Sequence, residues 1–211
     1  TKTRYAFYLD VDTELFPDTI NKLYNAANKI KDFSILAPRI NHFEYKKEHF
    51  LNRKNNFGYA TMRFVTGCAL FFKIELFKQI GFFDEKIFLY FEENDFYERC
   101  INNKKSIYLI EDSIINHVGN ASVNSIHKKE IEINRNWHLM WSTYYFHRKH
   151  YGVVSAFGKI LPKLLSAFFN VFFYSLTNQK EKKQIYYARL NGIISSIFGK
   201  KSSFRPKIES K

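Results

Sequence analysis

The stretch RYAFYLDVDTELFPDTI (residues 4–20) places two carboxylates directly after a run of five apolar residues (5–9). A short apolar run that contains aromatic residues predicts a buried strand. Asp10 and Asp12 then stand where that strand leaves its sheet, and alternate residues of an extended segment share a face. Because ligands of open α/β sheets collect at the carboxyl ends of strands, this stretch predicts an α/β fold with an acidic site at one edge.

The composition is that of a globular protein of about one to one and a half domains. The 211 residues are 45% hydrophobic and 25% charged, and 18% are aromatic. The two cysteines, Cys68 and Cys100, have no metal-ligand spacing. We therefore expect reduced thiols in a cytoplasmic setting.

The net charge of +13 is unevenly distributed along the chain. Residues 1–118 contain 17 Lys and Arg against 16 Asp and Glu, whereas residues 119–211 contain 16 against 4. This asymmetry predicts a nearly neutral catalytic or binding domain followed by a basic C-terminal segment that binds an anionic partner. We place the domain at 1–124 and the basic, helical tail at 125–211.

The order of predicted elements alternates between strands and helices. A helix is expected after Pro17, with Asp18 as its N-cap and helical apolar spacing up to Ile30. Gly81 closes a second, short helix, and a third begins near Glu92. Strands are expected at 33–40 (ended by Pro38), 64–73 and 107–110, with a shorter extended piece reaching His117, and 41–59 reads as a long loop.

The tail carries a long amphipathic pattern. Between 157 and 176, apolar residues recur at helical spacing for over five turns, with polar residues off the stripe. The longest uncharged run, 164–178, is shorter than the roughly 20 residues that span a bilayer. The stripe and its basic flanks favour a helix lying in a membrane interface, with packing on the protein's own core as the alternative.

Four motifs in order carry a family resemblance. They are Asp10-Val11-Asp12, VTGCALFFK (65–73), GFFDEKIFLYFEENDFYERC (81–100) and DSIINHVGNAS (112–122). Together they resemble the family 2 inverting glycosyltransferases of GT-A fold, especially the bacterial rhamnosyltransferase-like and galactofuranosyltransferase-like members. The resemblance covers roughly 5–122 and continues loosely into WHLMWSTYYFHRKHYG (137–152). It implies an incomplete GT-A (Rossmann-like) mixed sheet with flanking helices, followed by an α-helical C-terminal tail.

The resemblance implies a divalent metal at the D-x-D motif. A nucleotide-sugar donor leaves as a diphosphate, and Mn²⁺ or Mg²⁺ held by oxygen ligands would neutralise its charge. In the family, these carboxylates touch the donor ribose and the metal. We carry this over with Asp12 as the metal ligand, Asp10 as metal ligand or donor contact, and His117 as a third metal ligand. The alternatives are turn or helix-capping roles for the acids and a surface or core role for the histidine.

The resemblance also implies a catalytic base at the start of the third helix. The family places an acidic pair, usually Glu-Asp, at this point, and here the pair is Glu92-Glu93. Glu93 would take the proton of the acceptor hydroxyl, although its side chain is longer than the usual Asp. The alternative is a pair of acids that favour the first turn of a helix. Thr66, Gly67 and Asp84 fall in motifs that line the donor-sugar and acceptor pocket of relatives; Asp84 also suits a turn.

The expected partners follow from this assignment. They are a UDP- or dTDP-linked sugar, a glycan or lipid-linked acceptor of the cell envelope, such as a lipopolysaccharide precursor, and the anionic cytoplasmic face of the bacterial inner membrane. In relatives, the N-terminal βαβ half of the catalytic domain binds the nucleotide base and precedes the D-x-D strand. No such segment precedes Tyr5 in this sequence. We therefore expect a partial chain with weak donor binding and an exposed sheet edge.

Parts of the sequence are also compatible with three other functions. A haloacid-dehalogenase-like phosphatase also begins with a strand and D-x-D, but it needs Thr or Val at position 14, where Glu stands. A nucleic-acid-binding protein would use the basic tail, but the apolar stripe within that tail favours lipid. A catalytically inert, membrane-associated remnant of a glycosyltransferase stays open.

Overall fold

The computed structural model describes residues 3–52, 59–118 and 127–205, and it divides the chain into two compact units. The sheet unit holds 1–83 and 96–122, and the helical unit holds 84–95 and 123–211. The expected boundary at 124 lies outside the described residues. The segment Asp84–Asp95, which the sequence did not set apart, belongs with the helices.

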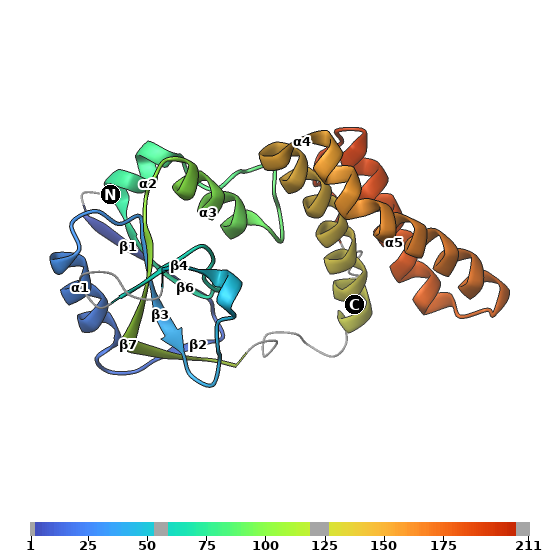
Figure 1. The fold of residues 1–211 in the computed structure, drawn as a ribbon. Coiled ribbons are helices and arrows are strands. Elements are labelled where there is room, and N and C mark those ends of the chain that lie inside the picture. The colour runs from blue at the N-terminus through green and yellow to red at the C-terminus, as the bar shows by residue number, and fades with distance from the viewer. Residues whose placement is uncertain (1–2, 53–58, 119–126, 206–211) are drawn as a thin grey trace. The chain divides into compact units, whose positions relative to one another are not determined.

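The sheet unit is built on a mixed sheet of seven strands. Its strands are β1 (Tyr5–Leu9), β2 (Thr13–Leu15), β3 (Ile35–Ile40), β4 (Phe50–Asn52), β5 (Ala60–Met62), β6 (Ala69–Lys73) and β7 (Ile107–His117). They lie in the order β1-β6-β3-β7-β5-β4, and β2 pairs with the far end of β7 (Figure 1). Among the described strands, β3 and β7 form the one parallel pair. The mixed α/β class expected from the sequence is confirmed.

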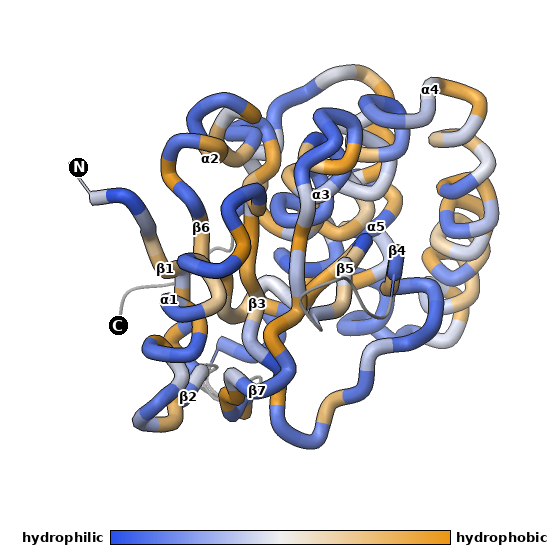
Figure 2. Tube along the Cα trace, turned by 60° about the vertical axis from the view of Figure 1, so that its left-hand side comes forward, coloured by the Kyte–Doolittle hydropathy of each residue, from blue (hydrophilic) through white to orange (hydrophobic). Residues whose placement is uncertain are grey.

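Helices cover both faces of this sheet because side chains of a strand alternate between faces. The helices are α1 (Thr19–Lys29), α2 (Ile74–Ile80) and α3 (Glu92–Asn102), with a 3₁₀ turn, η1 (Lys47–His49). Leu36 and Phe71 pack with α1 on one face. Ile35 and Phe72, their neighbours in sequence, pack with Phe96 of α3 on the other. Figure 2 shows the hydrophobic residues along β6.

Several predicted elements are corrected. The apolar run Tyr5–Leu9 is not buried: Tyr8 is 43% exposed and Leu9 38% exposed. The reason is that β1 lies at the edge of the sheet, where β6 is its one neighbour among the described strands. β3 does not end at Pro38; a shift of register follows that residue, and such an irregularity tolerates a residue without an N–H group.

The other corrections concern bounds. The strand expected at 64–73 begins only at Ala69, while the two extended pieces expected near 107–117 form one strand, β7. The expected loop at 41–59 contains η1 and β4, and its residues 53–58 lie outside the described part. The helix after Asp18, the helix that Gly81 closes and the helix from Glu92 are confirmed.

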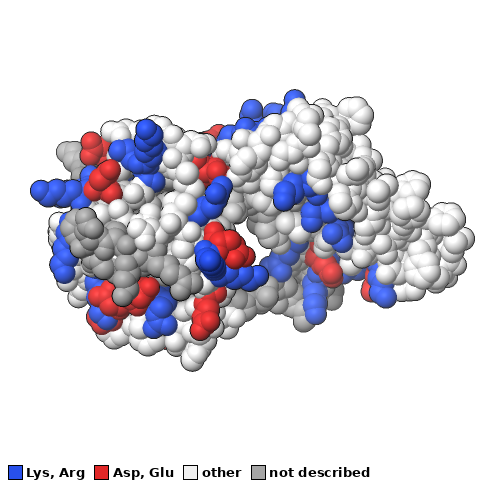
Figure 3. All heavy atoms as spheres, in the orientation of Figure 1, with Lys and Arg blue, Asp and Glu red and all other residues white. Residues whose placement is uncertain are grey.

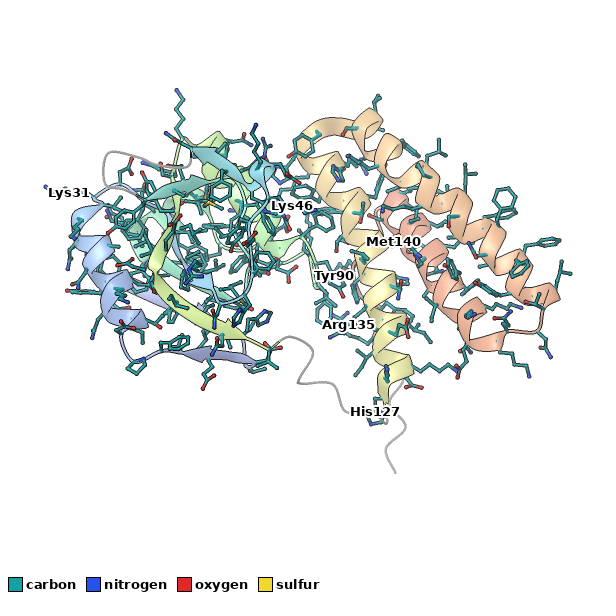
Figure 4. All side chains as sticks on the ribbon, turned by 60° about the horizontal axis from the view of Figure 1, so that its bottom comes forward. Lys31, Lys46, Tyr90, His127, Arg135 and Met140 are labelled. Atoms are coloured by element: carbon teal, nitrogen blue, oxygen red, sulfur yellow. The ribbon has the colours of Figure 1, made fainter. Side chains whose placement is uncertain are left out.

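The helical unit is dominated by two helices, α4 (Lys128–Leu176) and α5 (Lys180–Ile197). Gly152 has φ 82° and ψ 173°, so α4 consists of two helical segments, 128–151 and 153–176, joined at a sharp bend. This conformation is essentially restricted to glycine. Met140, labelled in Figure 4, packs with Ile193 of α5 in a core that also includes Tyr144 and Ile160. Figure 2 shows hydrophobic residues alternating with polar ones around α4.

Candidate metal centre and acidic helix start

The D-x-D motif and His117 meet at one end of the sheet unit. Asp10 and Asp12 lie in the turn between β1 and β2, and β2 pairs antiparallel with β7 so that Thr13 lies opposite His117. The Val118 amide also donates to the Asp12 carbonyl at 3.1 Å. This pairing joins residues about a hundred positions apart, which is why the sequence alone did not fix it.

The three side chains form a compact donor set. One oxygen of each carboxylate and one imidazole nitrogen lie within 4.8 Å of one another, and all three residues are half-buried. The Asp12 Oδ1 to His117 Nε2 distance is 3.3 Å. Two ligands of one Mn²⁺ or Mg²⁺ lie about 3 Å apart when each is about 2.1 Å from the ion. The donor set fits such an ion, and the imidazole favours Mn²⁺ over Mg²⁺.

Neighbouring groups hold this cluster in place. The Tyr8 hydroxyl donates to Asp10 Oδ1 at 2.8 Å, which orients that carboxylate. The Asp10 amide donates to the Cys68 carbonyl at 2.9 Å, so the segment that contains Thr66 and Gly67 lies beside the D-x-D motif. Thr66 is tied to Tyr45, whose hydroxyl accepts from the Thr66 amide at 3.1 Å.

Cys68 lies next to the cluster, because its carbonyl accepts the hydrogen bond from the Asp10 amide. Its side chain is buried, and burial together with the nearby Asp10 charge raises the pKa of the thiol to about 11. Both cysteines are free and buried.

The other predicted site residues, Glu92, Glu93 and Asp84, belong to the helical unit. Glu92 and Glu93 are half-buried in the first turn of α3, where carboxylates complement the helix dipole. The two residues before them, Tyr90 and Phe91, have φ values of 65° and 71°. Left-handed backbone costs about 1–3 kcal/mol at a bulky residue and clusters at functional sites. Figure 4 shows Tyr90 beside Arg135 of α4.

Asp84 is held by groups of α4. The Tyr145 hydroxyl donates to Asp84 Oδ2 at 2.8 Å, and Lys149 Nζ lies 2.7 Å from the same oxygen. Burial by itself would raise the pKa of Asp84, but hydrogen bonds from Lys149, the Lys86 amide and Tyr145 outweigh it and hold the pKa below its usual value. Asp84 also shapes a turn, because its carboxylate accepts from the Lys86 amide at 3.0 Å.

A buried ionic cluster in the helical unit was not foreseen. The carboxylate of Asp95 is fully buried, and it lies 2.7 Å from His150 Nε2 and 2.5 Å from Lys149 Nζ. These partners are more than fifty residues away along the chain, and no sequence pattern links them. Breaking a buried ionic contact leaves an uncompensated charge, so the cluster fixes how the start of α3 joins α4 within this unit.

No protein-family model matches the chain, and a search of curated proteins gives no significant match.

Proposed function

We propose that this chain forms part or all of a glycosyltransferase that moves a sugar, with inversion, from a UDP- or dTDP-linked donor to a glycan or lipid-linked acceptor of the cell envelope. The observation that carries the proposal is the cluster of Asp10, Asp12 and His117, which gathers two of the four motifs into one donor set. The motif that contains Thr66 and Gly67 lies beside this cluster, because the Asp10 amide donates to the Cys68 carbonyl.

The residues of the cluster take distinct roles in this proposal. Asp12 and His117 hold a divalent cation, and Asp10, oriented by Tyr8, contacts the cation or the donor ribose. When bound, the cation supplies positive charge next to the oxygens of the departing diphosphate. The half-buried position of all three residues lowers the local dielectric and strengthens their hold on that charge.

Glu93 is proposed as the base that accepts the proton of the acceptor hydroxyl, with Glu92 as its companion. Support comes from the strained backbone of Tyr90 and Phe91, which fixes the start of α3 at a conformational cost. Support also comes from Asp95, whose buried contacts hold the same turn of the helix.

We also propose that the helical unit attaches the protein to the cytoplasmic leaflet of the inner membrane. Phe168, Phe169, Phe172 and Phe173 are each more than half exposed. Among the described residues, α4 alone contains a stretch apolar and long enough to cross a bilayer, and 17% of that stretch is buried. On the face that Figure 3 shows, the end of this unit at the turn between α4 and α5 carries few charged side chains. A helix lying in the interface accommodates both the apolar face and the basic residues beside it.

Manganese binding tests the metal site directly. In a titration followed by the electron paramagnetic resonance of free Mn²⁺, the wild-type chain should bind one ion, and Asp12→Asn and His117→Ala should each weaken binding at least tenfold. Asp112→Asn removes an exposed carboxylate of β7 and should leave binding unchanged. Equal affinity in wild type and Asp12→Asn would overturn the metal assignment.

Turnover is tested separately from metal binding. Hydrolysis of UDP- and dTDP-sugars should require Mn²⁺ and should be lost in Asp12→Asn, while Glu93→Gln should lose transfer to an acceptor and keep Mn²⁺ binding. Metal binding without any turnover would favour the inert remnant over the transferase. Retention of transfer by Glu93→Gln would remove Glu93 from the role of base.

A further inference from the structure

The helical unit contains a pocket of about 920 Å³ that the proposed transfer reaction does not use. It is lined by α4, by the end of α5 with the segment that follows it, and by the turn at 85–88, all within this unit. A volume near the upper end of the 300–1,000 Å³ typical of small-molecule sites is larger than a lone phosphate needs.

The charged side chains around this pocket are almost all basic. Six cationic residues line it, against a single acid, Glu85. They are Lys86, Arg148, Lys149, Lys200, Lys201 and Arg205. Lys149 is neutralised by Asp84 and Asp95, but no ion pair among the described residues involves Lys86, Arg148, Lys200 or Lys201. Repulsion between such unpaired cations is relieved when an anion binds.

The wall of the pocket is aromatic and fixed. Trp141 stacks on Tyr145 with ring centroids 5.0 Å apart, and its Nε1 donates to the Lys200 carbonyl at 2.9 Å. The guanidinium of Arg205 lies over the ring of Phe88 at 3.4 Å. Aromatic side chains among the cationic lining residues, which we call the basic rim, suit a ligand that carries both an anionic and a ring-shaped or apolar part.

The segment after α5 is anchored, so the rim is held in position. The buried ring of His138 lies 2.8 Å from Ser202 Oγ through Nδ1 and 2.9 Å from the Phe204 carbonyl through Nε2. The Ser196 hydroxyl donates to the Trp141 carbonyl at 2.8 Å. These bonds hold the segment that carries the lining residues Lys200, Lys201 and Arg205, which reduces the ordering cost of binding.

We propose that this pocket binds a phosphate-bearing ligand, with the phosphate or diphosphate at the basic rim and a sugar, glycerol or lipid part against Trp141 and Tyr145. Phosphate is favoured over carboxylate because several separate cations surround one space and a diphosphate offers charge to more than one of them. The proposal does not rest on the metal site, since every residue involved lies in the helical unit.

Tryptophan fluorescence provides the readout. The two tryptophans, Trp137 and Trp141, both lie in the helical unit, and Trp137→Phe leaves Trp141, which lines the pocket, as the sole reporter. Pyrophosphate should change the Trp141 emission in a saturable manner, whereas sodium chloride at equal ionic strength should not. No saturable change with either pyrophosphate or vesicles containing phosphatidylglycerol would overturn the proposal.

A matched pair of double variants tests the location. Arg148→Gln with Lys200→Gln should weaken binding at least tenfold. Lys180→Gln with Lys183→Gln removes the same charge from exposed positions of α5 outside the pocket lining and should change binding less than twofold. Equal losses in both double variants would reduce the effect to general electrostatics and overturn the site. Circular dichroism confirms that each variant folds.

Two arms of the titration distinguish the source of the phosphate. Saturation by soluble pyrophosphate or glycerol phosphate that competes with vesicles identifies a soluble phosphorylated ligand. Pocket-dependent binding only to phosphatidylglycerol vesicles, and not to phosphatidylcholine vesicles, identifies a lipid headgroup. Mn²⁺ binding is measured in parallel on the same variants. Loss of phosphate binding in the pocket and loss of Mn²⁺ binding at the metal site can then be distinguished.

Discussion

The buried side chain of His138 makes the folding stability of the helical unit depend on pH. Burial lowers the pKa of its imidazole, and the nearby charge of Arg205 lowers it further. An unfolded histidine titrates near pH 6.5. The folded-state pKa of His138 lies below that value. The neutral imidazole therefore contributes fully to folding stability above about pH 6.5, and this contribution is lost as the pH falls through the folded-state pKa.

We therefore predict that thermal unfolding of the helical unit, followed by tryptophan fluorescence, shifts to lower temperature between pH 7.5 and pH 5. His138→Gln keeps a donor for the Phe204 carbonyl but cannot titrate, so its melting temperature should change less over the same interval. His147, whose pKa burial also lowers, leaves a residual slope in this variant. An unchanged slope in His138→Gln would contradict the assignment.

Two glycines of the helical elements should respond in opposite directions to the same substitution. A Cβ on Gly192 of α5 would lie 2.3 Å from the Trp137 carbonyl oxygen, so the backbones of α4 and α5 approach closely there. Gly158 of α4 has open space around it. Gly192→Ala should destabilise the protein by about 1–3 kcal/mol through overpacking. Gly158→Ala should stabilise it by about 0.5–1 kcal/mol through helix propensity. Urea unfolding measures both, and a stabilising Gly192→Ala would show that the helices do not meet at this point.

At the scale of elements, the sequence specified what is local. The N-terminal helix, the glycine that ends α2 and the acidic start of α3 follow from neighbouring residues, and the structure has them. What the sequence missed depends on partners far along the chain. β1 is exposed because of its place in the sheet, and Asp95 finds its partners on α4.

In the candidate site, too, the features that the sequence predicted differ from those that depend on pairing between distant segments. The meeting of Asp10, Asp12 and His117 was expected from the motifs, whereas the antiparallel pairing of β2 and β7 that creates it was not. The joint position of Glu93 with Asp12 stays a prediction, since the two residues belong to different units. The basic pocket has no compact sequence signature, because its cations come from three separate segments.

At the scale of the whole molecule, the excess positive charge and the exposed phenylalanine stripe of α4 occur in the same part of the chain. The excess of positive charge lies after residue 118, in the part of the chain that also exposes the phenylalanine stripe of α4. An anionic membrane offers complementary charge and a hydrocarbon boundary to one and the same unit. We therefore predict binding to phosphatidylglycerol vesicles that has a salt-sensitive electrostatic part and a salt-resistant apolar part.

The apolar part is tested by removing exposed rings. Phe169→Ser with Phe172→Ser should weaken vesicle binding in a sedimentation assay at least tenfold, because transfer of two phenylalanine side chains out of water contributes more than about 1.4 kcal/mol. Ile20→Ser with Tyr24→Ser removes two comparably exposed apolar side chains from α1 of the sheet unit and serves as the control. This control should bind as wild type does, since membrane attachment is assigned to α4. Equal binding by both double variants at high salt would show that these phenylalanines do not supply the salt-resistant part of the binding, and the interfacial helix would then have to be abandoned.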